Sequence, residues 1–417
     1  MNTQIKKSKL SGSIIARPSK SYAHRYLFAS MLSQNECIIS NVDFSDDIVA
    51  TLNCIHAYGK KHFRDFANHT VSFSNESEKN FDPTFDCKES GTTLRMFFPI
   101  AIEKYDKATF IGSERLIERG IDIYKDLFKY VSFCQDRYSI KTKGLLSGSE
   151  FNLPGNISSQ YISGLLYALP LLKNNSTINI TTNLESRNYV LMTLDVLTKY
   201  GIKIYCKSNK SNESIEYTKG LSDHMINFNQ FFIPGNQKYL ASDYSIEGDY
   251  SNIAFIDAFN YFDNNINISG LNPNSLQSDK IYKELFNKLS EGFCEIDISN
   301  CIDLGPILIT FAALKNGARF TNTERLKIKE SNRGEAIATE LKKCGADIEI
   351  KNNEIIVNKK ELSTPTSAFD SHNDHRIIMS LSLLSTLFDI ELKDSECVKK
   401  SYPDFFEDLK KLGANIN

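Results

Sequence analysis

Short motifs that combine a cation with Ser, Gly, Asp or Glu recur along the whole chain. The cations stand singly or in pairs, and the protein carries a formal net charge of −2 at pH 7. A general affinity for polyanions such as nucleic acid would require an excess of Lys and Arg. The motifs instead predict a focused pocket for small anions, in which phosphate or carboxylate oxygens neutralise the gathered cations. They are Lys20-Ser21-x-x-His24-Arg25, Gly91-Thr92-Thr93-Leu94-Arg95, Glu118-Arg119, Lys329-Glu330-x-x-Arg333, Asp374-His375-Arg376 and Lys400.

Several of these motifs stand directly before an apolar run with helical periodicity. Backbone N–H groups at the start of a helix bind anions well. A plain helix cap is the alternative for each motif, and the sequence leaves both open. The motifs and the helices that we expect after them are Lys20-Ser21 before 22–32, Ser90-Gly91-Thr92-Thr93 before a helix near Leu94, Ser158-Ser159-Gln160 before 161–172, and Asp303 before the run that follows Gly305.

The segment around Glu330 could perform proton transfer. Lys329 and Arg333 are four residues apart, so they share one face of a predicted helix. Glu330 lies between them and is either a salt-bridge partner or a proton donor whose pKa the surrounding charges tune.

Metal and nucleotide cofactors are not expected. His372-x-x-His375 could hold a metal, but Arg376 beside it would repel a cation and no other ligand cluster is evident. The sequence has neither G-x-x-x-x-G-K-[ST] nor G-x-G-x-x-G, so neither ATP nor NAD is implied.

Length and composition favour a globular protein of two domains, with 417 residues of which 41% are hydrophobic. No stretch approaches the roughly 20 apolar residues of a membrane helix, and residues 1–18 lack the apolar core of a signal peptide. The nine cysteines are scattered, without a C-x-x-C pair, which is typical of reduced thiols. We therefore expect a cytoplasmic protein that contacts neither membrane nor nucleic acid.

Six segments repeat one plan: a short alternating strand, a polar turn and an amphipathic helix that usually ends near Lys and Gly. In the fifth copy Ile337, Ala338 and Leu341 form the apolar helix face, and Gly345 suits the left-handed residue after the helix. The repeats predict an α/β protein of two similar domains with three copies each. The copies are 36–59, 108–130, 177–201, 267–289, 318–345 and 390–413.

The interval between the third and fourth copies is irregular and is expected to contain a hinge. It includes the polar stretch 208–214 and then Glu247-Gly248-Asp249. A strand around Ser13–Ala16 precedes the first copy and could pair with the later domain. We therefore predict a discontinuous domain, residues 1–18 plus 248–417, and a second domain, residues 19–247.

Taken in order, the motifs resemble the enolpyruvylshikimate-phosphate synthase family, the 3-phosphoshikimate 1-carboxyvinyltransferases. The resemblance extends over almost the whole chain and, as a set, is highly specific. It implies two domains of three αβ units each, an inside-out α/β barrel, in a protein expected to act as a monomer without cofactors. The motifs that carry it are Lys20-Ser21-Tyr22-Ala23-His24-Arg25, Ser90-Gly91-Thr92-Thr93-Leu94-Arg95, Gly112-Ser113-Glu114-Arg115-Leu116-x-Glu118-Arg119, Ser158-Ser159-Gln160, Ser186-Arg187-Asn188-Tyr189, Glu247-Gly248-Asp249, Lys329-Glu330-Ser331-Asn332-Arg333, Asp374-His375-Arg376 and Lys400-Ser401-Tyr402-Pro403-Asp404.

The resemblance implies that the 5-hydroxyl of shikimate 3-phosphate attacks phosphoenolpyruvate and that phosphate is released. Asp303 would be the base toward the hydroxyl, Glu330 the proton donor and acceptor at C3, and Lys20 the electrostatic partner. Shikimate 3-phosphate would be held by Lys20, Ser21, Arg25, Ser158, Ser159, Gln160, Ser186, Tyr189, Asp303 and Lys329. Phosphoenolpyruvate would be held by Lys20, Gly91, Arg119, Gln160, Arg333, Arg376 and Lys400. Glyphosate would occupy the phosphoenolpyruvate site, where Gly91 leaves it space.

Three residues depart from the family pattern: Glu89 stands in place of Asn, Gly120 in place of Pro, and Asn332 in place of Asp. A carboxylate at position 89 could weaken phosphoenolpyruvate binding unless it turns away or pairs with Lys88. Two alternatives remain, a transferase that acts on UDP-N-acetylglucosamine and a catalytically silent anion-binding relative. The first typically has a reactive cysteine where this chain reads Gly112-Ser113-Glu114-Arg115, and the second would lack the trio of Lys20, Asp303 and Glu330.

Overall fold

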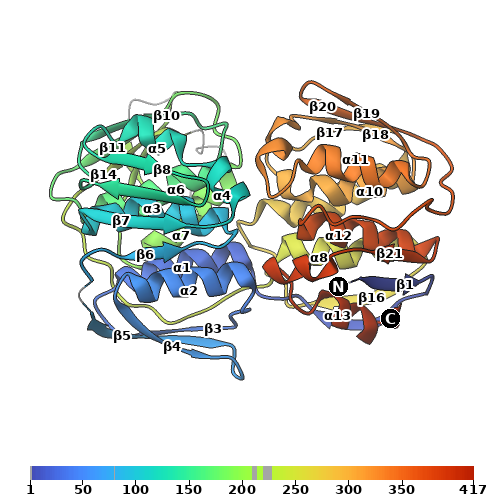
Figure 1. Cartoon of the computed structure of the whole chain (residues 1–417), viewed down its shortest axis with the longest axis horizontal. Coiled ribbons are helices and arrows are strands. Elements are labelled where there is room, and N and C mark those ends of the chain that lie inside the picture. The colour runs from blue at the N-terminus through green and yellow to red at the C-terminus, as the bar shows by residue number, and fades with distance from the viewer. Residues whose placement is uncertain (1, 79, 209–213, 219–227) are drawn as a thin grey trace. The chain divides into compact units, whose positions relative to one another are not determined.

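The computed structural model describes residues 2–78, 80–208, 214–218 and 228–417. Its contacts divide the chain into two compact units, Met1–Ser19 with Glu247–Asn417, and Lys20–Ile246 (Figure 1). The chain thus leaves the first unit after Ser19 and returns to it at Glu247. Most of the polar stretch that we considered as part of a hinge, residues 209–213, lies outside the described residues.

The unit Lys20–Ile246 contains sheets with one recurring strand pattern. In each, the first two strands of the order are parallel and the remaining neighbours are antiparallel. The orders are β15-β3-β5-β4, β6-β7-β9-β8 and β10-β11-β14-β12-β13. The strands are β3 (Cys37–Ser40), β4 (Lys60–Asp65), β5 (Thr70–Ser77), β6 (Thr84–Asp86), β7 (Lys107–Ile111), β8 (Ser132–Gln135), β9 (Ser139–Lys143), β10 (Glu150–Leu153), β11 (Ser176–Ile180), β12 (Tyr205–Ser208), β13 (Ser214–Glu216), β14 (Phe228–Ile233) and β15 (Tyr244–Ser245).

Three helices of this unit are buried on almost every side: α1 (Lys20–Leu32), α3 (Gly91–Lys104) and α6 (Ser159–Ala168). Apolar residues lie on all sides of each helix, which is typical of helices enclosed by other elements. Each begins at one of the polar motifs predicted to open a helix, so a hydrophobic interior fixes the position of the polar ends. The remaining helices are α2 (Asp46–Ala57), α4 (Glu114–Arg119), α5 (Asp122–Leu127), α7 (Arg187–Lys199) and the 3-10 turn η1 (Leu169–Leu171).

The unit Met1–Ser19 with Glu247–Asn417 joins the two ends of the chain in shared sheets. β1 lies between β21 and β22, and β2 pairs in parallel with β16. A further sheet has the order β17-β18-β20-β19, with the same parallel and antiparallel neighbours as the sheets of the other unit. The strands are β1 (Thr3–Lys6), β2 (Ser11–Ile15), β16 (Asn265–Ser269), β17 (Cys294–Asp297), β18 (Ala318–Thr321), β19 (Asp347–Lys351), β20 (Glu354–Asn358), β21 (Ile390–Leu392) and β22 (Asn415–Ile416).

This unit also has helices that are almost completely buried, α8 (Tyr250–Asp257), α10 (Gly305–Leu314) and α12 (His375–Ser382). Their residues belong to one hydrophobic core that also includes residues of α9 and α11. Asp303 lies just before α10, and Asp374 caps α12. The other helices are α9 (Tyr282–Glu291), α11 (Arg333–Lys342) and α13 (Phe405–Lys411), with 3-10 turns η3 (Ala258–Tyr261), η4 (Ser278–Ile281), η5 (Ile302–Leu304), η6 (Glu324–Ile328), η7 (Leu383–Thr386) and η8 (Ser395–Lys400).

The predicted strand-turn-helix plan is found in all six copies. The first strands of the copies are β3, β7, β11, β16, β18 and β21, and the helices that follow are α2, α4 with α5, α7, α9, α11 and α13. Gly345 has the expected left-handed φ of +78°. The second copy differs in that its helix is split, because Gly120 takes a φ of +58° and ends α4. The α/β fold class is confirmed.

No helix within the described residues is both long and apolar enough to cross a bilayer.

Candidate active site

At the start of α1, two cations of the first motif face different partners. Lys20 Nζ lies 2.7 Å from Asp47 Oδ2 of α2. Arg25 is buried, and its guanidinium donates to the Ser21 carbonyl at 2.7 Å, the Tyr189 carbonyl at 2.9 Å and Thr193 Oγ1 at 2.9 Å. Burial lowers the pKa of Arg25, since these partners are neutral. A buried cation with neutral partners is suited to receive an anionic group.

His24 has a structural role rather than a cationic one. Its Nδ1 lies 2.8 Å from Thr51 Oγ1, which lies 2.7 Å from Thr93 Oγ1. Thr93 in turn donates to Ser90 Oγ at 2.7 Å, so this buried chain links α1, α2 and α3. Burial, with Lys20 and Arg25 nearby, places the pKa of His24 well below its usual value. His24 is therefore a neutral link between these helices.

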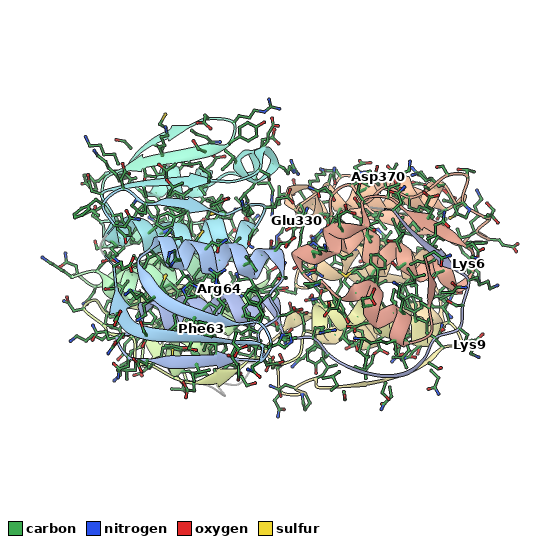
Figure 2. All side chains as sticks on the ribbon, turned by 60° about the horizontal axis from the view of Figure 1, so that its bottom comes forward. Lys6, Lys9, Phe63, Arg64, Glu330 and Asp370 are labelled. Atoms are coloured by element: carbon green, nitrogen blue, oxygen red, sulfur yellow. The ribbon has the colours of Figure 1, made fainter. Side chains whose placement is uncertain are left out.

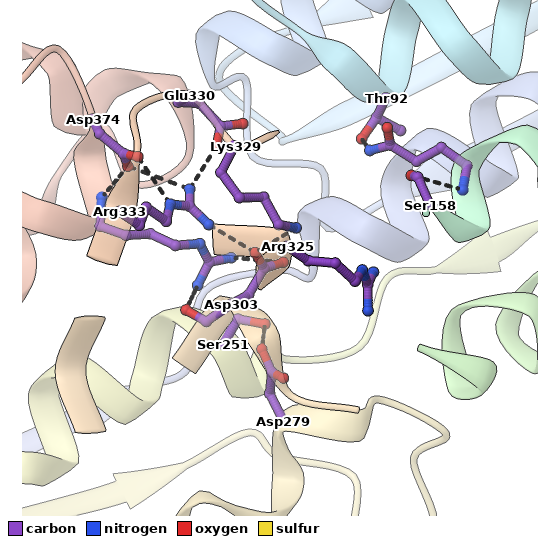
Figure 3. Close-up of polar contacts among 12 residues, drawn as sticks. Thr92, Ser158, Ser251, Asp279, Asp303, Arg325, Lys329, Glu330, Arg333 and Asp374 are labelled. Carbon is purple, nitrogen blue, oxygen red and sulfur yellow. Dashed lines mark hydrogen bonds and ion pairs between the residues drawn. The ribbon is translucent and has the colours of Figure 1, made fainter. Parts of the chain in front are cut away.

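The starts of α3 and α6 are joined through Gln160. Its Nε2 donates to Thr92 Oγ1 at 2.9 Å (Figure 3), and its Oε1 accepts from Arg95 Nη1 at 3.1 Å. Arg95 also donates to the carbonyls of Arg119 at 2.9 Å and Gly120 at 3.3 Å. The role of Arg95 is therefore to hold the backbone at Arg119, a role that its sequence motif did not reveal.

Gly91 lies against the Arg119 guanidinium. A Cβ at position 91 would stand 3.0 Å from Arg119 Nη2 and 3.4 Å from Arg95 Nη1. The glycine thus leaves these two guanidinium groups the room that they occupy. Glu89, one of the departures from the family pattern, lines a surface cavity of about 770 Å³ together with Lys88. Lys88 forms an ion pair with Asp86 at 2.5 Å.

The serines expected to bind phosphate lie at helix starts. Ser158 caps α6 by accepting from the Gln160 N–H at 3.3 Å, and Ser159 is buried. Ser186 precedes α7 with a φ of +50° and is also buried. A left-handed serine costs on the order of 1–3 kcal/mol, and such strain is concentrated at functional sites. Tyr189 lies one turn later, with its ring 5.7 Å from the Arg25 guanidinium carbon.

In the other unit, the Asp303 carboxylate is surrounded by cations (Figure 3). Arg333 Nη1 and Lys329 Nζ lie 2.8 Å and 3.0 Å from its Oδ1, and Arg376 Nη2 lies 3.6 Å from its Oδ2. Burial favours the neutral acid, but these cations outweigh it and keep the pKa of Asp303 well below its usual value. Asp303 is therefore ionised at neutral pH.

Arg333 is the centre of this cluster, with a side chain only 1% exposed. Besides Asp303 it contacts Glu330 Oε2 at 2.6 Å and Asp374 Oδ2 at 2.8 Å. Burial opposes its charge, yet the carboxylates raise the pKa of Arg333 above its usual value. Glu330 is thus a salt-bridge partner in this structure, one of the two roles that the sequence left open.

Two further cations expected to bind phosphoenolpyruvate hold backbone carbonyls. Arg376 Nη1 donates to the Asp303 carbonyl at 3.1 Å, and Lys400 Nζ donates to the Asn373 carbonyl at 2.6 Å. Lys329 is partly buried, and this desolvation lowers its pKa. The unit thus brings together Asp303, Lys329, Glu330, Arg333 and Arg376 in one network. Asp47 and Asp374, which pair with Lys20 and Arg333, were not among the predicted site residues, because their partners lie 27 and 41 positions away.

A second buried carboxyl, Asp279, lies close to this network (Figure 3). Ser251 Oγ donates to its Oδ2, and its Oδ1 has no hydrogen-bond partner among the residues that the structure describes. Burial, followed by the negative charge of Asp303, raises the pKa of Asp279 to about 6.

The pKa of Asp279 makes stability depend on pH. A carboxyl whose pKa is higher in the folded protein than in the unfolded chain holds its proton more strongly when folded. The free energy of unfolding therefore falls as pH rises from about 4 to 6, by up to about 3 kcal/mol for this group. We expect Asp279→Asn to lack this contribution, so its melting temperature relative to wild type should increase between pH 4.5 and pH 7.5. A constant difference across these pH values in calorimetry would contradict the assignment.

Comparison with known proteins identifies the family. The family EPSP synthase (3-phosphoshikimate 1-carboxyvinyltransferase) matches residues 5–409. The 3-phosphoshikimate 1-carboxyvinyltransferase of Clostridium perfringens is 40% identical over 98% of this chain and 98% of that protein. The Clostridioides difficile protein of the same name is 38% identical over 99% of this chain and 98% of its own. A solved EPSP synthase of Acinetobacter baumannii, 19% identical, covers 100% of this chain with a TM-score of 0.75, which shows the same fold.

Fold and relatives together define a transferase of carboxyvinyl groups. The chain belongs to the EPSP synthase (3-phosphoshikimate 1-carboxyvinyltransferase) family. The family and the enzyme class expected from the motifs are therefore confirmed.

Proposed function

We propose that this chain transfers the carboxyvinyl group of phosphoenolpyruvate to the 5-hydroxyl of shikimate 3-phosphate and releases inorganic phosphate. The observation that carries the proposal is the network in which the buried Arg333 joins Asp303, Glu330 and Asp374. Groups that could move protons are there held at fixed distances from the cations that would bind the substrate anions. The relatives are named for this reaction, 3-phosphoshikimate 1-carboxyvinyltransferase, and this chain matches them over nearly their full length.

The two sets of residues are assigned to the substrates as the resemblance implies. Each set contains a buried cation that could pair with an anionic substrate. It is Arg25 in the set for shikimate 3-phosphate and Arg333 in the set for phosphoenolpyruvate. Shikimate 3-phosphate is assigned to Lys20, Ser21, Arg25, Ser158, Ser159, Gln160, Ser186, Tyr189, Asp303 and Lys329. Phosphoenolpyruvate is assigned to Lys20, Gly91, Arg119, Gln160, Arg333, Arg376 and Lys400.

In the proposed addition step, the 5-hydroxyl oxygen bonds to C2 of phosphoenolpyruvate while C3 receives a proton from the protonated form of Glu330. That form becomes favourable when a substrate anion takes the place of the Glu330 carboxylate at Arg333. The hydroxyl proton goes to Asp303. In the elimination step, Glu330 removes a proton from C3, the double bond reforms, and the C2–O bond to phosphate breaks, while the proton held by Asp303 passes to the departing phosphate. Asp303 is a weak base while three cations face it. Substrate anions that engage Lys329, Arg333 and Arg376 would reduce this field and raise the pKa of Asp303 toward that of a useful base.

The test is the release of phosphate from phosphoenolpyruvate with and without shikimate 3-phosphate. We expect release only when both are present, with one phosphate formed for each carboxyvinyl ether. Release that requires UDP-N-acetylglucosamine instead would favour the related transferase. A well-folded protein that releases no phosphate with either acceptor would be the silent relative.

We also propose that the two compact units are the two domains and that the protein acts as a cytoplasmic monomer. All nine cysteines are free thiols, which fits a reducing compartment. Light scattering should give the mass of one chain, 47.3 kDa, and a dimer mass at micromolar concentration would contradict this part of the proposal.

Gly91→Ala is expected to make the enzyme tolerant of glyphosate. The added Cβ would stand 3.0 Å from Arg119 Nη2, so the guanidinium must shift within the proposed phosphoenolpyruvate site. The inhibitor is longer than the substrate and should lose more binding. We expect the inhibition constant to rise at least about tenfold, or 1.4 kcal/mol, and KM for phosphoenolpyruvate to rise less. Competition kinetics measure both.

Gly292→Ala is the matched control, because a Cβ there meets no atom within 4 Å. It should change neither constant. Equal increases in the inhibition constant and in KM for Gly91→Ala would show that position 91 does not distinguish inhibitor from substrate.

A further inference from the structure

A buried glutamate of α11, Glu340, has no part in the proposed chemistry. Its side chain is only 2% exposed. Its carboxylate accepts from Lys343 Nζ at 2.6 Å and from the Asp370 N–H at 2.8 Å, and it lies 2.9 Å from His372 Nε2. A carboxylate is costly to bury without partners, so this set of contacts requires a particular placement of the segment that supplies them.

That segment, residues 370–374, has an unusual backbone. His372 and Asn373 have φ values of +50° and +53°. A left-handed conformation is unfavourable at a residue other than glycine, because Cβ approaches the following carbonyl oxygen. Two in succession persist only where surrounding contacts hold them. Here the Asp370 N–H and the His372 ring are both held by Glu340.

The same segment leads directly to cations assigned to phosphoenolpyruvate. The Asn373 carbonyl accepts from Lys400 Nζ at 2.6 Å. Asp374 binds Arg333 and caps α12, where Arg376 follows two residues later. A shift of the turn at His372 and Asn373 would therefore move the partners of Lys400 and Arg333 and the start of α12.

Helix α11 holds this segment at two points. Arg333, its first residue, binds Asp374, and Glu340, about two turns further along, binds Asp370 and His372. The position of Asp370, at one end of this segment, can be found in Figure 2, as can that of Glu330, the residue that binds Arg333 at the start of α11. One rigid helix thus fixes both ends of the segment.

We propose that the contact between Glu340 and His372 is a positioning element for phosphoenolpyruvate, because it holds the turn that places Lys400 and the start of α12. The inference rests on the proposed function. Neither residue is a catalytic group, since both act through the segment 370–374. His372, first considered as a metal ligand, thus has a different partner.

The contact also depends on pH. The hydrogen bond to Glu340 raises the pKa of His372, burial opposes the shift, Asp370 adds to it and Lys343 reduces it. The protonated ring therefore pairs with Glu340 at low pH. Because the pKa is higher in the folded protein, this stabilisation is complete below the usual value of 6.5 and is lost as pH rises through the folded-state pKa.

The experiment compares His372→Phe with His372→Gln. Phe removes the hydrogen bond, whereas Gln retains an N–H donor without a titratable charge. We expect His372→Phe to raise KM for phosphoenolpyruvate about tenfold, or 1.4 kcal/mol, with a smaller change in kcat. KM for shikimate 3-phosphate should be unaffected. His372→Gln should restore most of the affinity for phosphoenolpyruvate.

The pH profile gives a second readout. The KM ratio of His372→Gln to wild type should fall between pH 6 and pH 9, because only wild type loses an ion pair over this range. Ionisation of phosphoenolpyruvate itself is common to both proteins and cancels in the ratio. His56→Phe, at an exposed histidine of the other unit, is the control and should change neither KM nor its pH dependence.

Amide hydrogen exchange makes the positioning role testable apart from the reaction. Exchange in segment 370–374 should be faster in His372→Phe than in wild type and close to wild type in His372→Gln. Unchanged exchange or an unchanged KM in His372→Phe would overturn the inference. A wild-type protein without carboxyvinyl transfer would instead overturn the proposed function, and the exchange rates would still decide whether the contact holds the segment.

Discussion

Asp303→Asn and Glu330→Gln are each expected to lower kcat by about 10²-fold or more, which is typical of losing a general acid or base. Both replacements keep the shape of the side chain and remove its charge. Asp303 lies among Lys329, Arg333 and Arg376, and Glu330 contacts Arg333 at 2.6 Å. The amides can still accept hydrogen bonds from these cations, so the effect should fall on proton transfer more than on binding.

Arg25→Gln provides the contrast, because Arg25 is assigned to binding. Its guanidinium is buried, and the partners to which it donates among the described residues are neutral. The phosphate of the substrate would therefore be the first charged group that it contacts. A charge-assisted hydrogen bond is worth about 1.5–3 kcal/mol, which predicts a KM for shikimate 3-phosphate that is higher by about 10- to 150-fold. Steady-state kinetics with both substrates varied separate the two effects. Near wild-type turnover in both Asp303→Asn and Glu330→Gln would show that the roles are wrong.

Arg333→Met is expected to destabilise the unit Met1–Ser19 with Glu247–Asn417 and to abolish activity. It leaves Asp303, Glu330 and Asp374 without the cation that they share. Removing one partner of a buried ion pair costs about 3–5 kcal/mol, and here the Asp374 carboxylate stays fully buried while Asp303 and Glu330 stay largely shielded from water. Urea unfolding at neutral pH should show this loss. The loss should be smaller at acidic pH, where protonation neutralises the carboxylates.

Arg319→Met is the matched control for this prediction. Arg319 of β18 also binds two carboxylates, Glu295 at 2.9 Å and Glu354 at 2.5 Å, but its side chain is 45% exposed. Exposed ion pairs contribute about 0–1 kcal/mol, because water and salt screen them. Equal destabilisation by Arg319→Met and Arg333→Met would contradict the special role of burial at Arg333.

The sequence by itself determined the repeating elements and the motifs at the helix starts. A period of two residues for strands and of 3.6 for helices depends only on near neighbours along the chain. Strands such as β3 and β18, and helices such as α2 and α11, could therefore be predicted. The order of the motifs was also sufficient to predict the family. Even here one local detail was missed, since the second copy divides into α4 and α5 at Gly120.

Only the tertiary structure decided which charges meet. Arg25 contacts Thr193, which is 168 positions away, while Arg333 contacts Asp374 across 41 positions. No periodicity relates such pairs, because packing of separate helices brings them together. The protonation states also depend on the tertiary structure. Burial in the folded protein, with Lys20 and Arg25 nearby, lowers the pKa of His24 and keeps its ring neutral. Asp303 is kept ionised by cations from η6, α11 and α12 and the residues beside them, because a pKa depends on the sum of all nearby charges and on exclusion of water.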